Sequence, residues 1–465
     1  MKPSVPAMVF MAAVVLVSAT FMAMAPPDGL SLAGQRVLGI TIITIGLWGT
    51  ELLPMGVISM LLVVLLALSG GVKDLQAALI GFAQPVPYFL IAVLTIGLAV
   101  KKSGLAERIA RFFLRKCRQR PLTLYQHLLI SLPLLTLILP SATARTGILV
   151  HVYEQALSLS MVPKDAQLSK AIMMALNSIN RLASTIFLTG GITPVVAAAL
   201  VGGMPWSRWL IFMSIPYLVL LFLGAGLIYL TYRRGFSIQM SRVPDVVSGP
   251  LTKLELRTIA ITLGASLLWL SDAIHHMDPV IPALLAWICL LAPGVGVLSW
   301  REFEKNLGWS NFFVIASSMS LASALINSGA GSWLAQLIIG RLPALSQSPI
   351  VVATILMIAA APIRLLIPNI TGFLAVCIPI AMSIATLTGL NPLVCGLLVM
   401  IAGDAVLYYP AQSASSLVVY ERGYLTATEI FWFGTLMTLV AILVALLVAI
   451  PYWGLLGEPL AAILR

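Results

Sequence analysis

The sequence repeats itself after about 225 residues, and this repeat limits most strongly what the chain can fold into. Pro87-Tyr88-Phe89-Leu90-Ile91-Ala92 is echoed by Asn311-Phe312-Phe313-Val314-Ile315-Ala316, and Pro140-Ser141-Ala142-Thr143 is echoed by Pro368-Asn369-Ile370-Thr371. The second pair places helix-breaking and polar residues inside apolar stretches of both halves. Two related halves that are interrupted in this way are typical of secondary transporters.

The composition places this duplicated chain in a membrane. Its residues are 60% hydrophobic and only 9% charged, whereas a soluble domain carries about 25% charged residues. Near-continuous apolar stretches, many of them over ~18 residues long, favour helices over a barrel of alternating strands. We therefore predict an all-α polytopic membrane protein.

The net charge of +11 does not indicate a nucleic-acid partner. Lysine and arginine gather in short polar stretches, of which 101–121 and 232–256 are the richest. Such stretches are typical of cytoplasmic loops beside a lipid bilayer. The four cysteines form no CxxC pair, so neither a disulfide framework nor a zinc site is expected.

The charge asymmetry between the halves predicts that they are inverted. Residues 101–121 carry many basic side chains interleaved with Phe112 and Phe113, a pattern of an amphipathic helix on the inner membrane surface. The matching residues 326–346 carry only Arg341. An odd number of spans in each half produces inversion, and five in each plus a leading helix make about 11 transmembrane helices.

This scheme divides the chain into five parts. They are a leading transmembrane helix (1–30), a first inverted repeat (31–232), a cytoplasmic linker (233–256), a second inverted repeat (257–455) and a C-terminal tail (456–465). Residues 1–25 also fit a cleaved signal peptide, but their apolar run is long enough to span a membrane, and we favour a retained helix.

Four breaks put prolines, glycines and hydroxyls where hydrocarbon is otherwise expected, at 139–147, 188–194, 367–372 and 408–416. Non-helical backbone at membrane depth is tolerated where it is buried in protein or lines a wet cavity. The N–H groups of an interrupted helix favour an anion, and Ser, Thr and Asn add neutral donors. We predict re-entrant hairpins whose tips bind one anion. Hydroxyls that only bond their own helix are the alternative.

The predicted substrate-binding residues come from these breaks: Ser141, Thr143, Arg145, Thr189, Thr193, Asn369, Thr371, Ser413 and Ser415. Ser141, Thr143, Asn369 and Thr371 also suit a sodium ion. Arg145 either pairs with the substrate or bonds carbonyl groups of its hairpin, and the sequence leaves both open. For Arg181, Arg364 and Asp404 a structural or interfacial role is favoured.

At these breaks the chain resembles the divalent anion:sodium symporter family of the ion transporter superfamily. Pro140-Ser141-Ala142-Thr143-Ala144-Arg145 is similar to the Pro-Ser-Asn-Thr-Ala-Arg of the plastid dicarboxylate translocators and the citrate/succinate exchangers, and Gly423-Tyr424-Leu425 resembles the end of the second signature region. The resemblance implies an eleven-span homodimer in which part of each protomer moves as an elevator. It also implies succinate, malate, 2-oxoglutarate, citrate or sulfate as substrates.

Two departures from that family bear on the coupling ion. Ala142 stands where the first signature has Asn, and Ile370 is inserted in the second. These losses favour exchange of anions over sodium symport, although both stay open.

We predict a secondary active transporter of di- or tricarboxylates, multi-pass in a bacterial inner membrane. No cofactor beyond a sodium ion is expected. A transporter of sulfate or another inorganic oxyanion is the alternative. An intramembrane enzyme is remote, because Gly403-Asp404 has no second catalytic Asp in an apolar helix.

Overall fold

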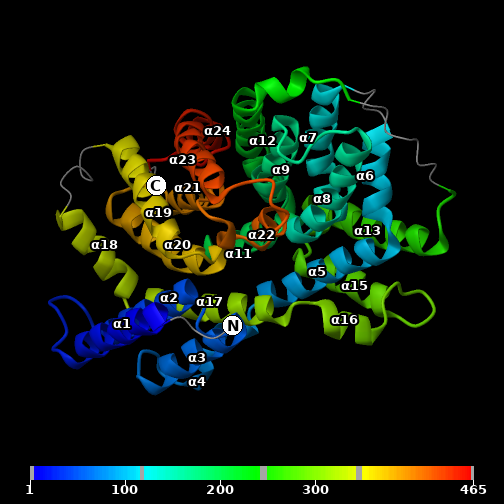
Figure 1. Cartoon of the computed structure of the whole chain (residues 1–465). Coiled ribbons are helices and arrows are strands. Elements are labelled where there is room, and N and C mark those ends of the chain that lie inside the picture. Colours follow the sequence, from blue (N-terminus) through cyan, green and yellow to red (C-terminus); the bar gives the residue numbers. More distant parts are fainter. Residues whose placement is uncertain (1–4, 116–119, 241–248, 342–347, 462–465) are drawn as a thin grey trace.

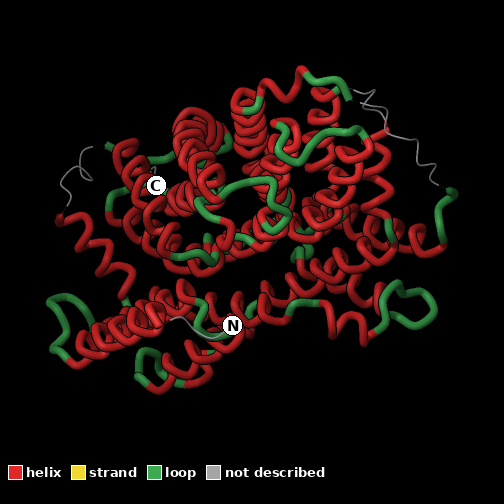
Figure 2. The backbone as a smooth tube through the Cα atoms, in the orientation of Figure 1, coloured by secondary structure: helices red, strands yellow, loops and turns green. Residues whose placement is uncertain are grey.

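Helices carry almost all of the structure (Figure 2). This computed structural model describes residues 5–115, 120–240, 249–341 and 348–461. Within those ranges it contains no strand, only an isolated β-bridge between Leu390 and Ala461. Nine of the described helices are long and apolar enough to cross a membrane. The predicted all-α polytopic membrane protein is confirmed.

One group of helices forms a slab along the lower part of Figure 1, and both halves of the chain contribute to it. In the slab α3 packs on α17 and α15 packs on α5, so helices of one half lie on helices of the other. The helices of the slab are α2 (Leu32–Thr50), α3 (Met55–Leu68), α5 (Pro85–Ser103), α13 (Lys253–Leu270), α15 (Val280–Leu291) and α17 (Trp309–Asn327).

Within the slab, the backbone of the first half comes very close to the backbone of the second half at one point. Gly81 lies in a 3₁₀ turn, η1 (Ile80–Ala83), that rests on α17. Its N–H donates to the Ser320 hydroxyl at 3.0 Å. A Cβ at this position would collide with the carbonyl oxygen of Ala316 and the nitrogen of Ser320. Only glycine therefore permits this contact.

The second group of helices, in the upper part of Figure 1, contains two helical hairpins. The first joins α7 (Pro121–Ile138) to α8 (Ala142–Leu159), and the second joins α19 (Pro349–Leu366) to α20 (Ile370–Leu387). Pro140 and Pro368 interrupt these helices because proline has no N–H to continue the ladder. A helix from the same half, α10 or α21, packs against both arms of its hairpin, so the arms fold back as predicted.

Two interrupted helices, one from each half, pack around the hairpins. The first runs through α9 (Gln167–Met174), a π-helix η2 (Ala175–Ile179), α10 (Asn180–Thr185) and η3 (Leu188–Gly190) to α11 (Ile192–Leu200). The second runs through α21 (Pro392–Asp404) and η6 (Pro410–Gln412) to α22 (Ala414–Tyr420). Again the halves cross over, because α11 packs on α20 and α22 packs on α8.

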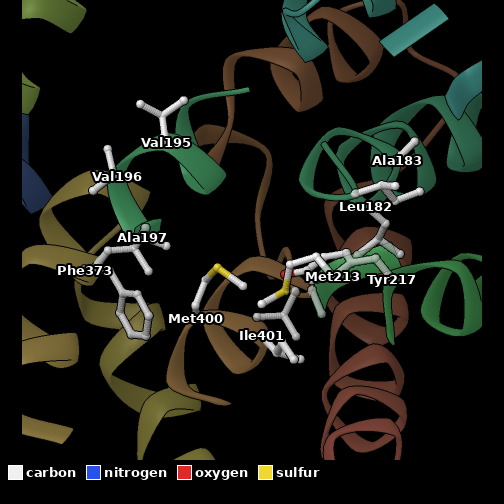
Figure 3. Close-up of a cluster of buried hydrophobic side chains, with 14 of the residues drawn as sticks. Leu182, Ala183, Val195, Val196, Ala197, Met213, Tyr217, Phe373, Met400 and Ile401 are labelled. Atoms are coloured by element: carbon white, nitrogen blue, oxygen red, sulfur yellow. The ribbon is translucent and has the colours of Figure 1, made fainter. Parts of the chain in front are cut away.

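The second group of helices, called the bundle below, has a core to which both halves contribute (Figure 3). It forms where α10, α11, α20 and α21 meet α12 (Trp206–Thr231). Gly403 has no side chain, which lets the Phe373 ring pack against its backbone. The buried side chains shown include Leu182, Ala183, Val195, Val196, Ala197, Met213, Tyr217, Phe373, Met400 and Ile401.

The helices that remain agree with the expected number of spans. Setting aside the hairpin arms, the connecting helices α6 (Leu105–Arg115) and α18 (Ala330–Arg341) and the short helices leaves eleven rods in the described chain. They are α1 (Val5–Ala23), α2, α3, α5, α9–α11, α12, α13, α15, α17, α21–α22 and α23–α24 (Ala427–Leu455).

Parts of the predicted scheme lie outside the described residues. These parts are 1–4 of the leading helix, 116–119 of the basic stretch, 241–248 of the linker, 342–347 of the second repeat and 462–465 of the tail. The inversion of the two halves across the bilayer and the five domain boundaries stay predictions.

Candidate binding cavity

A cavity of about 880 Å³ lies between the slab and the bundle. Residues of all four breaks line it, together with residues of α5 and of the start of α17. The cavity brings together seven of the nine predicted residues: Ser141, Thr143, Thr193, Asn369, Thr371, Ser413 and Ser415. Positions more than 220 residues apart in the sequence thus face one space, whose size suits a small ligand.

The tip of the first hairpin presents a hydroxyl donor. Ser141 is the N-cap of α8, and its Oγ accepts a hydrogen bond from the Ala144 N–H at 3.3 Å. Because this oxygen is occupied as an acceptor, its own O–H is left to donate into the cavity. Gly97 on α5 lies opposite, and a Cβ there would be 3.8 Å from the Ser141 Cβ. The absence of a side chain at Gly97 therefore keeps the tip accessible.

The tip of the second hairpin presents an amide donor. The Asn369 side-chain oxygen caps α20 by accepting from the N–H groups of Thr371 at 2.8 Å and Gly372 at 3.4 Å. Its NH₂ group takes no part in this cap, and the residue lines the cavity, so an amide donor is left for a ligand there. Gly372 packs against the Trp48 ring of α2, which brings this tip close to the slab.

The interrupted helices add further donors. α11 begins after Gly191, which offers no side-chain cap, so its first N–H groups keep no side-chain partner at this end. Thr193 lies in that first turn and lines the cavity. In the other break, the Ser413 and Ser415 hydroxyls are 2.8 Å apart and bond each other. The N-termini of α8, α11 and α20 all meet at this cavity, and their dipoles favour an anion there.

Two predicted site residues lie behind the cavity wall. Arg145 is fully buried, and its guanidinium donates to the carbonyl oxygens of Leu139 at 2.6 Å and Asn180 at 3.2 Å. Of the two roles that the sequence left open, this geometry is the structural one. Thr189 is also buried, where its hydroxyl oxygen accepts from the Trp206 indole N–H at 3.3 Å.

The other charged residues at the breaks divide into two kinds. Arg364 is fully buried and bonds the carbonyl oxygens of Ile367 and Pro368, both at 2.6 Å. Arg181 and Asp404, in contrast, line the cavity. With Lys101 and Glu51, they give the described wall two cationic and two acidic side chains. The wall therefore carries no formal net charge, and its hydroxyls, amides and helix ends set its polarity.

Several cavity residues were not singled out from the sequence. Asn306, Asn311, Ser184, Thr185 and Gln412 also line the wall. Asn311 opens the second copy of the duplicated motif, so its position in the repeat was a usable signal. Ser184 and Thr185 lie in α10, outside the four predicted breaks, where nothing in the sequence pattern distinguishes a lining hydroxyl from a structural one.

Among the described residues no group of three or more His, Cys, Asp or Glu side chains is placed to hold a metal ion. A sodium ion bound by hydroxyls and carbonyl groups near the two tips remains a prediction.

Comparison with known proteins identifies the family. Residues 6–458 match the family described as the sodium:sulfate symporter transmembrane region. The chain belongs to this family. It is thus a multi-pass membrane transporter of the divalent anion:sodium symporter type, and the resemblance drawn from the hairpin motifs is confirmed.

Relatives are found across most of the chain. A Cupriavidus necator membrane protein is 24% identical over 471 residues, which cover 94% of this chain and 90% of the relative. The L-tartrate/succinate antiporters of Escherichia coli and Shigella flexneri are each 25% identical over 405 residues, covering 83% of this chain and 81% of theirs.

Solved structures share the fold. The Alcanivorax borkumensis YdaH transporter superposes with a TM-score of 0.57 at 17% identity, covering 99% of this chain and 100% of that one. Neisseria gonorrhoeae MtrF gives 0.52 at 12% identity, with 96% and 94% covered.

Proposed function

We propose that this protein exchanges small divalent organic anions across a bacterial inner membrane. The substrate class is a dicarboxylate such as succinate, malate or tartrate, and tricarboxylates such as citrate are the next candidates. One carboxylate lies against the two hairpin tips, and the cavity alternates between the two sides of the membrane. The observation that carries this proposal is the meeting of three helix N-termini and both tips on one cavity.

The donors on this cavity suit carboxylates. The Ser141 O–H, the Asn369 NH₂ and the first N–H groups of α11 are neutral donors, and none of them releases a proton on binding. Hydrogen bonds from such donors to a charged oxygen are each stronger than bonds between neutral partners. Three donors from separate elements therefore satisfy the oxygen atoms of a bound carboxylate.

Exchange is favoured over sodium symport by two observations. Ala142 lines the cavity where the family signature carries an amide, so one oxygen ligand for a cation is missing near the first tip. Two of the relatives named above, those of Escherichia coli and Shigella flexneri, are named antiporters.

The contacts around the hairpins support movement of the bundle against the slab. α20 packs along α17, whereas α8 meets the equivalent α5 near its tip at Gly97. Related halves that make unequal contacts open a cavity to one side, and exchanging the contacts opens it to the other. We propose that this swap of contacts between the two halves is the transport step. We further propose that the protein is a homodimer in which the slab stays fixed.

Counterflow in proteoliposomes tests the function. Vesicles loaded with unlabelled succinate should take up labelled succinate faster than empty vesicles, with or without a sodium gradient. Saturable uptake that needs inward sodium and no internal anion would instead establish symport. No saturable flux of any di- or tricarboxylate would overturn the substrate class.

The family description itself supports the second candidate function. Because that description names sulfate, a competition panel should include sulfate, thiosulfate and phosphate against labelled succinate. Competition by sulfate at a lower concentration than by any dicarboxylate would assign the transporter to inorganic oxyanions.

A further inference from the structure

Three arginines lie near the breaks, and two of them are occupied by the backbone. Arg145 donates to the Leu139 and Gly190 carbonyl oxygens, and its Nε donates to the Asn180 side-chain oxygen at 2.9 Å. Arg364 donates from Nε to the Gly403 carbonyl oxygen at 3.2 Å and from Nη1 to the hairpin tip. Neither side chain lines the cavity, and in each of them both Nε and Nη1 have acceptors.

Arg181 differs from both. It lines the cavity and is 9% exposed. Its Nη2 donates to the carbonyl oxygens of Asp404 and Val406. Its Nε is buried and has no hydrogen-bond partner among the described residues. A buried donor on a charged group is costly to leave unmatched. Because Nε itself has almost no open surface, a ligand oxygen would approach the guanidinium from the edge that lines the cavity.

The carboxylate beside Arg181 does not supply that acceptor. The Asp404 carboxylate oxygen accepts hydrogen bonds from the Thr185 hydroxyl at 2.7 Å and the Tyr217 hydroxyl at 3.2 Å. Arg181 therefore bonds the backbone of Asp404, while the carboxylate is held by neutral hydroxyls. The Asp404 carboxylate thus takes none of the hydrogen-bond donors of Arg181, and the backbone of Asp404 fixes where the guanidinium lies.

The local backbone explains why Arg181 reaches the wall. The π-helix η2 (Ala175–Ile179) directly precedes α10, and such an inserted turn shifts the helical phase of every following residue. Arg181 and Thr185 are four residues apart on α10, so they share one face, and both line the cavity. Asn177, inside the π-helix, accepts from the Ser416 hydroxyl at 2.6 Å, which ties this irregular turn to the other break.

We propose that Arg181 binds the second carboxylate of the substrate and so selects dianions over monoanions, with Asp404 as its positioning residue. This inference rests on the proposed function and deepens it. The donors at the hairpin tips are neutral and bind one carboxylate of either kind of ligand. A guanidinium offers a charged fork that fits a second carboxylate and gains far less from an uncharged amide. Discrimination by charge therefore falls to Arg181.

The test compares succinate with its monoamide, succinamate, which has nearly the same shape and one charge fewer. Binding of each to the purified full chain in lipid nanodiscs gives a ratio of two affinities. This ratio does not depend on the fraction of active protein. The wild type should prefer succinate about tenfold or more, as expected for one charge-assisted pair. Arg181→Gln should lower the preference to about threefold or less, and Arg181→Lys should retain part of it.

Lys101→Gln is the matched control. Lys101 is the other cation on the wall, but its side chain is exposed on the slab, so its removal should leave the ratio at the wild-type value. An unchanged ratio in Arg181→Gln, or an equal loss in Lys101→Gln, would overturn the assignment to Arg181. Failure of the wild type to bind either compound would overturn the proposed function together with this inference.

A second variant keeps the inference testable if Arg181→Gln does not fold. Asp404→Asn preserves the backbone carbonyl group that Arg181 bonds and the acceptor oxygen for Thr185 and Tyr217. Removing the negative charge beside Arg181 should raise the preference for succinate several-fold. A preference that is unchanged or lower would contradict the role of this pair.

Discussion

Arg145 and Arg364 close the two hairpins in the same way from opposite arms. Arg145 follows the first tip on α8 and donates to the Leu139 carbonyl oxygen at 2.6 Å. Arg364 precedes the second tip on α19 and donates to Ile367 and Pro368 at 2.6 Å. Each also reaches the adjacent interrupted helix, through Gly190 at 3.4 Å or Gln412 at 3.5 Å. Both arginines thus supply donors to carbonyl groups that no helix satisfies.

Replacing either arginine should therefore prevent stable folding. Arg145→Met or Arg364→Met removes buried charged donors from several carbonyl groups near the tips, at a cost of about 3 kcal/mol or more. Size-exclusion chromatography and thermal unfolding of the detergent-solubilised variants measure this loss. Arg208→Met is the control, because its pair with Glu458 is a surface contact whose arginine side chain is 44% exposed. Variants of Arg145 or Arg364 as stable as that control would contradict the structural role.

Removing one donor from either hairpin tip should weaken binding without unfolding the protein. Ser141→Ala and Asn369→Ala each delete a donor to a charged oxygen, and such a bond contributes about 1.5–3 kcal/mol, or roughly ten- to a hundredfold in affinity. Each also removes a helix cap worth about 1 kcal/mol.

Succinate affinity and thermal midpoint, measured on the same preparations, separate these two effects. Thr136→Val is the matched control. Within the described part of the chain this buried hydroxyl bonds only the Leu132 carbonyl oxygen, at 2.8 Å, and it lies outside the cavity lining. Equal affinity losses in all three variants would refute the assignment of the tips.

The contact between Gly81 and α17 predicts a strong effect of a small substitution. Gly81→Val forces a side chain into the backbone of Ala316 and Ser320, so the two elements must separate. We expect a loss of about 2 kcal/mol or more, seen as a lower thermal midpoint and less monodisperse protein. Gly340→Val on α18 is the control, because nothing lies within 4 Å of its added Cβ. A Gly81 variant that matches this control would show that the two halves are not packed as described.

Acid should weaken one link between α5 and α16 (Trp300–Asn306). A hydrogen bond from Lys102, followed by one from the Ser299 N–H, lowers the pKa of the Glu302 carboxyl from 4.5 to about 2. Because this pKa is depressed by folding, the stabilisation is complete above about pH 4.5 and is lost as the pH falls toward 2.

Glu302→Gln tests this link. The variant should reduce the fall of the thermal midpoint between pH 5 and pH 3 relative to the wild type. The effect should be small, because the Glu302 side chain is 39% exposed and solvent screens the pair. A variant with the same dependence of thermal midpoint on pH as the wild type would show that the Lys102–Glu302 pair does not stabilise the fold.

The positions of the breaks could be predicted from sequence because their causes are local. Pro140, Pro368 and Pro410 cannot donate the backbone hydrogen bond that continues a helix. The hydroxyls beside them would find no hydrogen-bond partner in hydrocarbon. Because the two halves are related copies, their breaks are expected to meet at one place. For these reasons the hairpins, the eleven rods and half of the cavity lining were accessible without a structure.

The roles of the arginines were not accessible in the same way. Arg145 stands in a break by sequence, but it lies in the first turns of α8, and side chains there point back toward the helix start and the tip carbonyl groups. Arg181 reaches the wall through the phase shift of a π-helix, which the apolar pattern of residues 167–185 does not reveal. Side-chain direction depends on such irregular turns, whereas break position depends only on residue type.

The most direct measurement is the location of a bound substrate. A cryo-electron microscopy structure of the protein in lipid nanodiscs with saturating succinate should show density that touches both residues 141–143 and residues 369–371. Density at neither tip, or at only one of them while transport is intact, would contradict the claim that the two hairpins together bind the anion.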